Sequence, residues 1–193
     1  MIAKIPITLN KMNLGQLIAY GEIMDAIRDT NDLDHHQWID NLCMIAFKTP
    51  MMKHSIKEHD LKNIAGAVIE GCDSVLKDYQ RIIKRLDHRH FFPIIWADDE
   101  KLRVKTVLHI EPNIAELPSQ IWAQLLEVTK VIDSNKTIAF EFQAIIPILS
   151  RIAWAKNEKM LIDKGLGFNE VNQKAIFEKE NSMYLINARH AVE

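Results

Sequence analysis

One strand-like stretch in an otherwise helical sequence constrains the fold most. Residues 91–96 are rich in aromatic and β-branched side chains, and residues 102–110 alternate apolar and polar almost to the end of the run. The charged residues 97–101 between them predict a turn, so the sequence predicts an antiparallel β-hairpin over residues 91–110. A two-stranded hairpin is only marginally stable alone in water, so this one needs a third strand or a helical surface beside it.

The extended segment at residues 2–9 is the natural candidate for that third strand. It alternates apolar and polar residues around Pro6. Proline has no amide hydrogen, so it belongs in an edge strand or at the end of a strand.

Helical periodicity covers most of the remaining chain. Apolar residues at steps of three and four predict helices over residues 13–29, 34–47, 56–87, 117–132, 137–159 and 169–188. Asn13 suits the N-cap of the first helix. The helix at 137–159 is apolar on almost every side, which predicts a central position, and Pro147 should kink it.

The predicted fold class is therefore α+β, mainly α: about a six-helix bundle with a small antiparallel β-hairpin or sheet. We predict a single domain over residues 1–193, with a helical core at about 13–162. The hairpin at 91–110 belongs to this domain, and the C-terminal helix at about 169–189 is polar enough to be peripheral.

Four residues on the helices depart from the ordinary pattern. Gly66 and Gly71 lie inside the long third helix, where each costs about 1 kcal/mol relative to alanine. We expect a neighbouring element to approach closely at these glycines. Glu141 and Arg151 lie in the apolar helix at 137–159, where burial and pairing with other helices would fix its register, whereas a catalytic role would require a cleft beside them.

Composition and charge exclude several classes of protein. The 24 basic and 26 acidic residues give a net charge of −2, which argues against a nucleic-acid binder with a concentrated basic face. Residues 137–155 have the length of a membrane span, but their charged residues favour burial in a bundle, so we expect no membrane partner. The start of the chain has no apolar run of signal-peptide length, which favours a cytosolic origin. Cys43 and Cys72 lie on apolar helix faces, as buried free thiols in a reducing compartment would.

The histidines suggest one enzymatic alternative. His59 is followed by Asp60, and His35, His36 and His54 lie elsewhere in the first third of the chain. An HD dipeptide on a helix is typical of metal-dependent phosphohydrolases of the HD type. Here the dipeptide lies in a polar helix start instead of following an apolar helix, so the prediction is no metal site. A helical HD-type phosphohydrolase remains the alternative reading.

No other motif supports catalysis or a cofactor. His88 and His90 share one strand face and could chelate zinc, but no third ligand lies nearby in the sequence. Gly165 and Gly167 follow a helix and lack the third glycine of a phosphate-binding loop. A Gly-x-Ser-x-Gly motif is absent from the sequence. We therefore predict a non-enzymatic protein, with no catalytic residue, metal ligand or cofactor.

The hairpin aromatics are the predicted interface. In strand geometry Phe92, Ile94 and Trp96 share one face, while Phe91 lies on the other. Both faces are apolar, and a hairpin in a small domain covers only one of them well. We predict that Phe91, Phe92, Ile94 and Trp96 dock onto a partner or another subunit, because aromatic anchors dominate interface energies.

Several motifs together carry a family resemblance. They are the opening Lys-Ile-Pro-Ile-Thr-Leu at 4–9, Met-Asn-Leu-Gly-Gln at 12–16 before an amphipathic helix, the hairpin at 91–110, and Leu-Ser-Arg-Ile-Ala-Trp-Ala-Lys-Asn-Glu at 149–158. Over about two-thirds of its length the chain resembles small accessory proteins of tailed bacteriophages. The similarity is to tail-assembly-chaperone-like or virion-associated structural proteins of phages that infect Bacteroidota.

The resemblance implies a non-enzymatic structural or assembly protein of a phage particle that acts by protein–protein docking. Its expected partners are other virion or assembly proteins, including a second copy of itself, and its expected place is the virion or the host cytoplasm. A regulatory binding module that inhibits a host protein is a further alternative.

Overall fold

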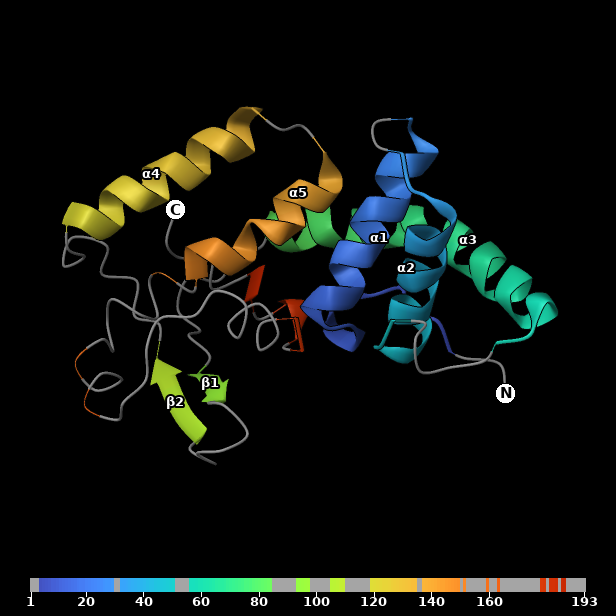
Figure 1. Ribbon diagram of the computed structural model, residues 1–193, viewed down its shortest axis with the longest axis horizontal. Coiled ribbons are helices and arrows are strands. Elements are labelled where there is room, and N and C mark those ends of the chain that lie inside the picture. The colour runs from blue at the N-terminus through green and yellow to red at the C-terminus, as the bar shows by residue number, and fades with distance from the viewer. Residues whose placement is uncertain are drawn as a thin grey trace.

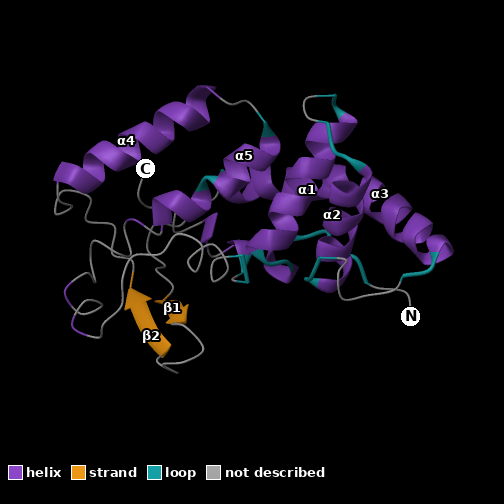
Figure 2. Cartoon of the chain, viewed as in Figure 1, coloured by secondary structure: helices purple, strands orange, loops and turns teal. Residues whose placement is uncertain are grey.

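The computed structural model describes residues 4–29, 32–50, 56–84, 93–97, 105–109, 119–134 and 137–149, and positions 151, 159, 163, 178–179, 181–183 and 185–186. Within these residues the elements are the 3-10 helix η1 (Leu9–Lys11), α1 (Leu14–Ile27), α2 (His35–Phe47), α3 (Glu58–Ile83), β1 (Pro93–Ala97), β2 (Lys105–His109), α4 (Ser119–Ser134) and α5 (Ile138–Gln143). Helices make up most of the described chain (Figure 2).

Side-chain caps fix where the first two helices begin. The side chain of Asn13 accepts a hydrogen bond from the Gln16 backbone N–H at 2.9 Å, and the Gln16 side chain accepts one from the Asn13 N–H at 3.0 Å. Asp34 and Gln37 form the same reciprocal pair at the start of α2. Each capping box satisfies backbone donors that have no partner within the helix. The prediction that Asn13 is an N-cap is confirmed.

Helix α1 lies at the centre of the described fold. It contacts α2, α3 and α5 (Figure 1). Its buried residues are Leu14, Gly15, Gln16, Leu17, Ile18, Ala19, Tyr20, Gly21, Ile23, Met24 and Asp25. The sequence predicted a central helix at 137–159 instead. In the described part of that helix Phe142, Ile145 and Leu149 are fully buried in the core, whereas Phe140 and Gln143 are half-buried.

Contact between α1 and α5 depends on a glycine and a carboxylate. A Cβ atom added to Gly21 would lie 2.7 Å from the Ala139 Cα, so only glycine permits this approach. One turn further along α1, the buried carboxylate of Asp25 accepts hydrogen bonds from the backbone N–H groups of Ile138 at 2.9 Å and Ala139 at 2.7 Å. These bonds satisfy two of the donors at the start of α5, and the Thr137 hydroxyl accepts a third, from the Phe140 N–H.

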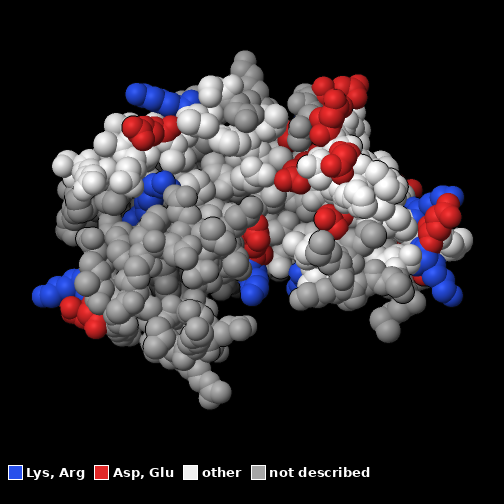
Figure 3. Space-filling model, viewed as in Figure 1, with Lys and Arg blue, Asp and Glu red and all other residues white. Residues whose placement is uncertain are grey.

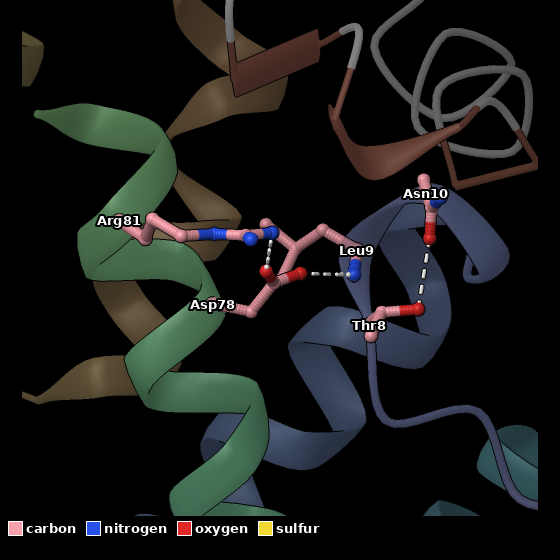
Figure 4. Close-up of polar contacts among 5 residues, drawn as sticks. All are labelled: Thr8, Leu9, Asn10, Asp78 and Arg81. Atoms are coloured by element: carbon pink, nitrogen blue, oxygen red, sulfur yellow. Dashed lines mark hydrogen bonds and ion pairs between the residues drawn. The ribbon is translucent and has the colours of Figure 1, made fainter. Parts of the chain in front are cut away.

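The described part of the N-terminal segment, residues 4–9, packs along α1 and α3 and forms no strand. The Tyr20 hydroxyl donates to the Pro6 carbonyl at 2.9 Å. The Asp78 carboxylate of α3 accepts from the Leu9 backbone N–H at 2.9 Å, while its other oxygen pairs with Arg81 (Figure 4). Backbone groups of residues 6 and 9 are therefore bound by helix side chains instead of by a neighbouring strand.

The predicted α+β class with about six helices is wrong. Strands β1 and β2 pair antiparallel, with Pro93 opposite His109 and Ala97 opposite Lys105. Their sheet has only these two strands among the described residues, because the N-terminal segment that was to supply a third packs against helices. The described core is built from the five α-helices, the segment that precedes them, the helical residues 145–149 after α5, and Leu185 and Ile186 near the C-terminus.

Most of the predicted sixth helix lies outside the described residues. In the segment expected to be peripheral, Ser182, Leu185 and Ile186 are at most 2 % exposed. The Ser182 backbone N–H donates to the Met12 carbonyl at 3.1 Å, and its hydroxyl donates to the Leu9 carbonyl at 2.8 Å. These residues near the C-terminus therefore pack against the start of the chain.

The long helix α3 and the interruption of the helix at Pro147 agree with the predictions from the sequence. Helix α3 has 26 residues and buries one stripe, which confirms the predicted periodicity over Glu58–Ile83; residues 85–87 of the predicted helix lie outside the described residues. Among the described helices, none is both long and apolar enough to cross a membrane. Helix α5 ends at Gln143, and after a turn at Ala144 residues 145–149 are helical again. Pro147 explains this break, since its ring clashes with the carbonyl four residues earlier.

The two glycines of α3 have different surroundings. A Cβ atom on Gly71 would lie 3.1 Å from Ile7 Cγ2 and 3.2 Å from the Tyr20 hydroxyl oxygen. The expected close approach is therefore confirmed at Gly71, where two side chains make it. Gly66 has no heavy atom within 4 Å of an added Cβ, so the expectation is wrong there.

Both cysteines are buried free thiols, as predicted. Burial raises the pKa of the Cys72 thiol from its ordinary 9.0 to about 11, and the nearby Asp73 carboxylate adds to the rise. At pH 8 the thiolate fraction of Cys72 is then about 100-fold lower in the folded protein than in the unfolded chain. We expect iodoacetamide to modify Cys72 at least about 100-fold more slowly without urea than with it.

The same shift predicts a loss of stability at high pH. The pKa of the Cys72 thiol is higher in the folded protein than in the unfolded chain. Its contribution to the free energy of unfolding is therefore complete below about pH 9 and is lost as the pH rises towards 11. Urea unfolding of the wild type and Cys72→Ala between pH 8 and 11 measures this contribution. Parallel pH dependence in the two proteins, or equal alkylation rates in the folded and unfolded states, would contradict the assignment.

Candidate functional site: a groove between α4 and α5

A groove separates α4 from the chain that follows it. It has a volume of about 400 Å³ and is lined by Gln124, Glu127, Val128, Val131, Phe140, Gln143, Ala144, Pro147 and Arg151. The first four lie on α4, and the other five lie on α5 and the residues after it (Figure 1). This volume is within the range of pockets that bind small molecules or side chains of a partner.

The two walls are linked at one point by an arginine. The Nε of Arg151 donates to the Gln124 side-chain oxygen of α4 at 3.2 Å, and its Nη1 donates to the Pro147 carbonyl at 3.1 Å. Its bond to Gln124 pairs Arg151 with another helix, which is one of the two roles that the sequence left open for it. The guanidinium thereby fixes the distance between the walls at this point of the groove.

The α5 wall is held in place from behind. The Gln143 amide donates at 3.0 Å to Glu22 of α1, whose other oxygen accepts from the Asn41 amide of α2 at 2.8 Å. The Tyr79 hydroxyl of α3 donates to Glu141, which confirms that this glutamate pairs with another helix. The Tyr79 ring also meets the Phe142 ring edge to face, with centroids 4.9 Å apart. Side chains from three helices thus hold α5 as a preformed wall.

Helix α4 carries three exposed large apolar side chains, of which only Val131 lines the groove. Leu125 is buried against the core, but Trp122 is 37 %, Leu126 55 % and Val131 52 % exposed. The visible surface over α4 is mostly uncharged, whereas acidic side chains gather over α1 and α2 (Figure 3).

The histidines of the enzymatic alternative do not converge in the described part of the chain. At the exposed start of α3, the His59 side chain is 86 % and that of Asp60 57 % exposed, and their closest charged atoms are 3.9 Å apart. His35 and His36 are exposed in the first turn of α2. Within the described ranges, no group of three or more His, Cys, Asp or Glu residues is placed to hold a metal ion.

The remaining predicted site residues are only partly described. Strand β1 places Ile94 opposite Leu108 and Trp96 opposite Thr106 in backbone register. Phe91 and Phe92 lie outside the described residues, as do His54, His88, His90, Gly165 and Gly167. The predicted interface on the hairpin stays a prediction.

Sequence reasoning missed the groove, although part of its signal was present. Glu141 and Arg151 marked the helix at 137–159 as unusual, and Arg151 lines the groove. The α4 wall had no such marker, because its apolar lining residues Val128 and Val131 simply extend an apolar helix.

Comparisons with known proteins identify no relative of this chain: no protein-family model, no curated protein and no solved structure matches it.

Proposed function

We propose that the chain is a non-enzymatic docking protein that binds an apolar helical segment of a partner protein in the α4–α5 groove. The observation that supports this most is the exposed Val131 on the α4 side of the groove, opposite α5, which side chains of other helices hold in place. Val131 is 52 % exposed at the groove, so a partner that covers it removes this apolar area from water. Two helices that flank a groove suit a third helix laid between them.

The polar lining indicates the chemistry of the bound segment. The lining contains one carboxylate, Glu127, and one guanidinium, Arg151, beside two amides. A bound helix with an apolar ridge, a basic residue towards Glu127 and an acidic residue towards Arg151 would complement both charges. These side chains suit hydrogen bonding better than nucleophilic attack, which would need an activated Ser or Cys. Together with the resemblance to phage accessory proteins, they favour a virion or assembly protein as partner, in the virion or the host cytoplasm.

Site-specific photo-crosslinking tests this proposal. A benzophenone amino acid at position 131 should give one discrete crosslinked product with a second protein in the native cell or particle. The same probe at Ile69 of α3, which is 47 % exposed, should give none. Identification of the product as a virion or assembly protein supports the proposal. A metabolic enzyme, or no product from position 131, contradicts it.

Binding of that purified partner gives the quantitative prediction. Val131→Asp places a charge in the apolar groove, so we expect at least a tenfold weaker Kd. Ile69→Asp is the matched control, because it adds the same charge at a similarly exposed apolar position and should leave Kd unchanged. Isothermal titration calorimetry measures both. Equal losses of affinity in the two variants would place the binding surface elsewhere.

A further inference from the structure

We propose that a second surface of α4 pairs with α4 of a second copy of this chain, antiparallel about a twofold axis at Leu126. The surface is the stripe Trp122, Leu126 and Lys130, whose spacing of four residues aligns them along one side of the helix. Trp122 is 37 % and Leu126 55 % exposed, and Lys130 is exposed as well. We call this set the outer stripe.

The outer stripe is separate from the groove. Glu127 and Val131 line the groove, and successive residues on an α-helix are rotated by about 100°. Val131 is five residues from Leu126 and so lies about 140° away around the helix. A partner in the groove and a second copy on the outer stripe would therefore contact different faces of α4.

The chemistry of the outer stripe favours a second copy over an unrelated partner, because the stripe complements itself. Trp122 and Lys130 each lie four residues from Leu126, on opposite sides. In an antiparallel pair centred on Leu126, the two leucines meet at the axis. Each Trp122 then faces the Lys130 of the other copy, so the pair gains two cation–π contacts.

The direction and the length of α4 determine the expected affinity of the dimer. Antiparallel α4 helices also align their dipoles favourably, with each N-terminus beside the other C-terminus. The 16 residues of α4 span about 24 Å, so the contact is smaller than the roughly 800 Å² per partner of a standard stable interface. We therefore expect a dimer that dissociates in the micromolar range.

Cysteine crosslinking tests the twofold axis directly. Leu126→Cys would place two thiols at the axis, and both native cysteines, Cys43 and Cys72, are buried. We expect mild oxidation to convert most of this variant, at about 50 µM, into a disulfide-linked dimer. Val131→Cys, at a similarly exposed position in the groove, should stay monomeric. Absence of the Leu126→Cys dimer, or equal crosslinking of both variants, overturns the proposal.

Sedimentation equilibrium gives the second measurement and separates this inference from the proposed function. Leu126→Asp and Lys130→Glu should each raise the dimer Kd at least tenfold, while Val131→Asp should leave it unchanged. Circular dichroism confirms that each variant is folded. A monomeric wild type at 200 µM, or equal dimer Kd values in all three variants, contradicts the pairing. Loss of groove binding in Val131→Asp with an intact dimer shows that the two surfaces act independently.

Discussion

Gly21→Ala is expected to lower the free energy of unfolding by about 2 kcal/mol, although alanine is the better helix former. The new Cβ atom would lie 2.7 Å from the Cα and 2.9 Å from the backbone N of Ala139. Backbone atoms cannot rotate away as a flexible side chain does, so α1 and α5 must move apart. Overpacking of this kind costs about 1–3 kcal/mol or more, which outweighs the gain of about 1 kcal/mol in helix propensity.

Gly66→Ala is the matched control for this prediction. Gly66 is also a glycine inside a helix, but it is exposed and no heavy atom lies within 4 Å of an added Cβ. The substitution should therefore stabilise the protein by about 0.5–1 kcal/mol. Urea unfolding of both variants measures the opposite signs. A stabilising Gly21→Ala substitution would contradict the close contact between α1 and α5.

Asp25→Ala is expected to lower the free energy of unfolding by about 3–4 kcal/mol. The Asp25 side chain is buried and accepts hydrogen bonds from the backbone N–H groups of Ile138 and Ala139. Its removal leaves these donors without their acceptor, and each unsatisfied buried donor costs about 1–3 kcal/mol. Asp25→Asn keeps one acceptor oxygen and should lose about half as much stability.

An aspartate of the same helix end provides the control for Asp25. Asp29 is exposed and has a left-handed backbone conformation, with φ 54°, that asparagine tolerates. Asp29→Asn should change the free energy of unfolding by less than about 0.5 kcal/mol. Chemical denaturation at pH 7 measures all three variants. Equal effects of Asp25→Asn and Asp29→Asn would show that the buried carboxylate does not hold the start of α5.

The Asp25 variant also connects stability to the proposed function. Helix α5 supplies one wall of the groove, and Asp25 fixes its first turn against α1. At a temperature where Asp25→Ala is still folded, the first turn of α5 should be less firmly held. We therefore expect this variant to bind the partner more weakly, even though residue 25 does not line the groove. Hydrogen exchange of the Ala139 and Phe140 amides reports this local loosening independently of binding.

Local signals made most of the described helices predictable. Asn13 marks the start of α1 because its side chain bonds a backbone group only three residues away. The stripe of α3 is visible because a period of 3.6 is encoded in neighbouring residues. The fold class was mispredicted because the strand expected at residues 2–9 has backbone groups that helix side chains bind at Pro6 and Leu9.

The sequence by itself determined where helices begin, where α5 must break before Pro147, and that both cysteines would be buried thiols. Only the tertiary structure decided that α1 is central, that Gly21 and Asp25 join it to α5, and that a groove forms beside α4. The physical reason is range. Caps and periodicity act within about four residues, whereas Asp25 and Ala139 are 114 positions apart. The packing of the whole chain decides which apolar side chains remain exposed, as it does for Trp122, Leu126 and Val131.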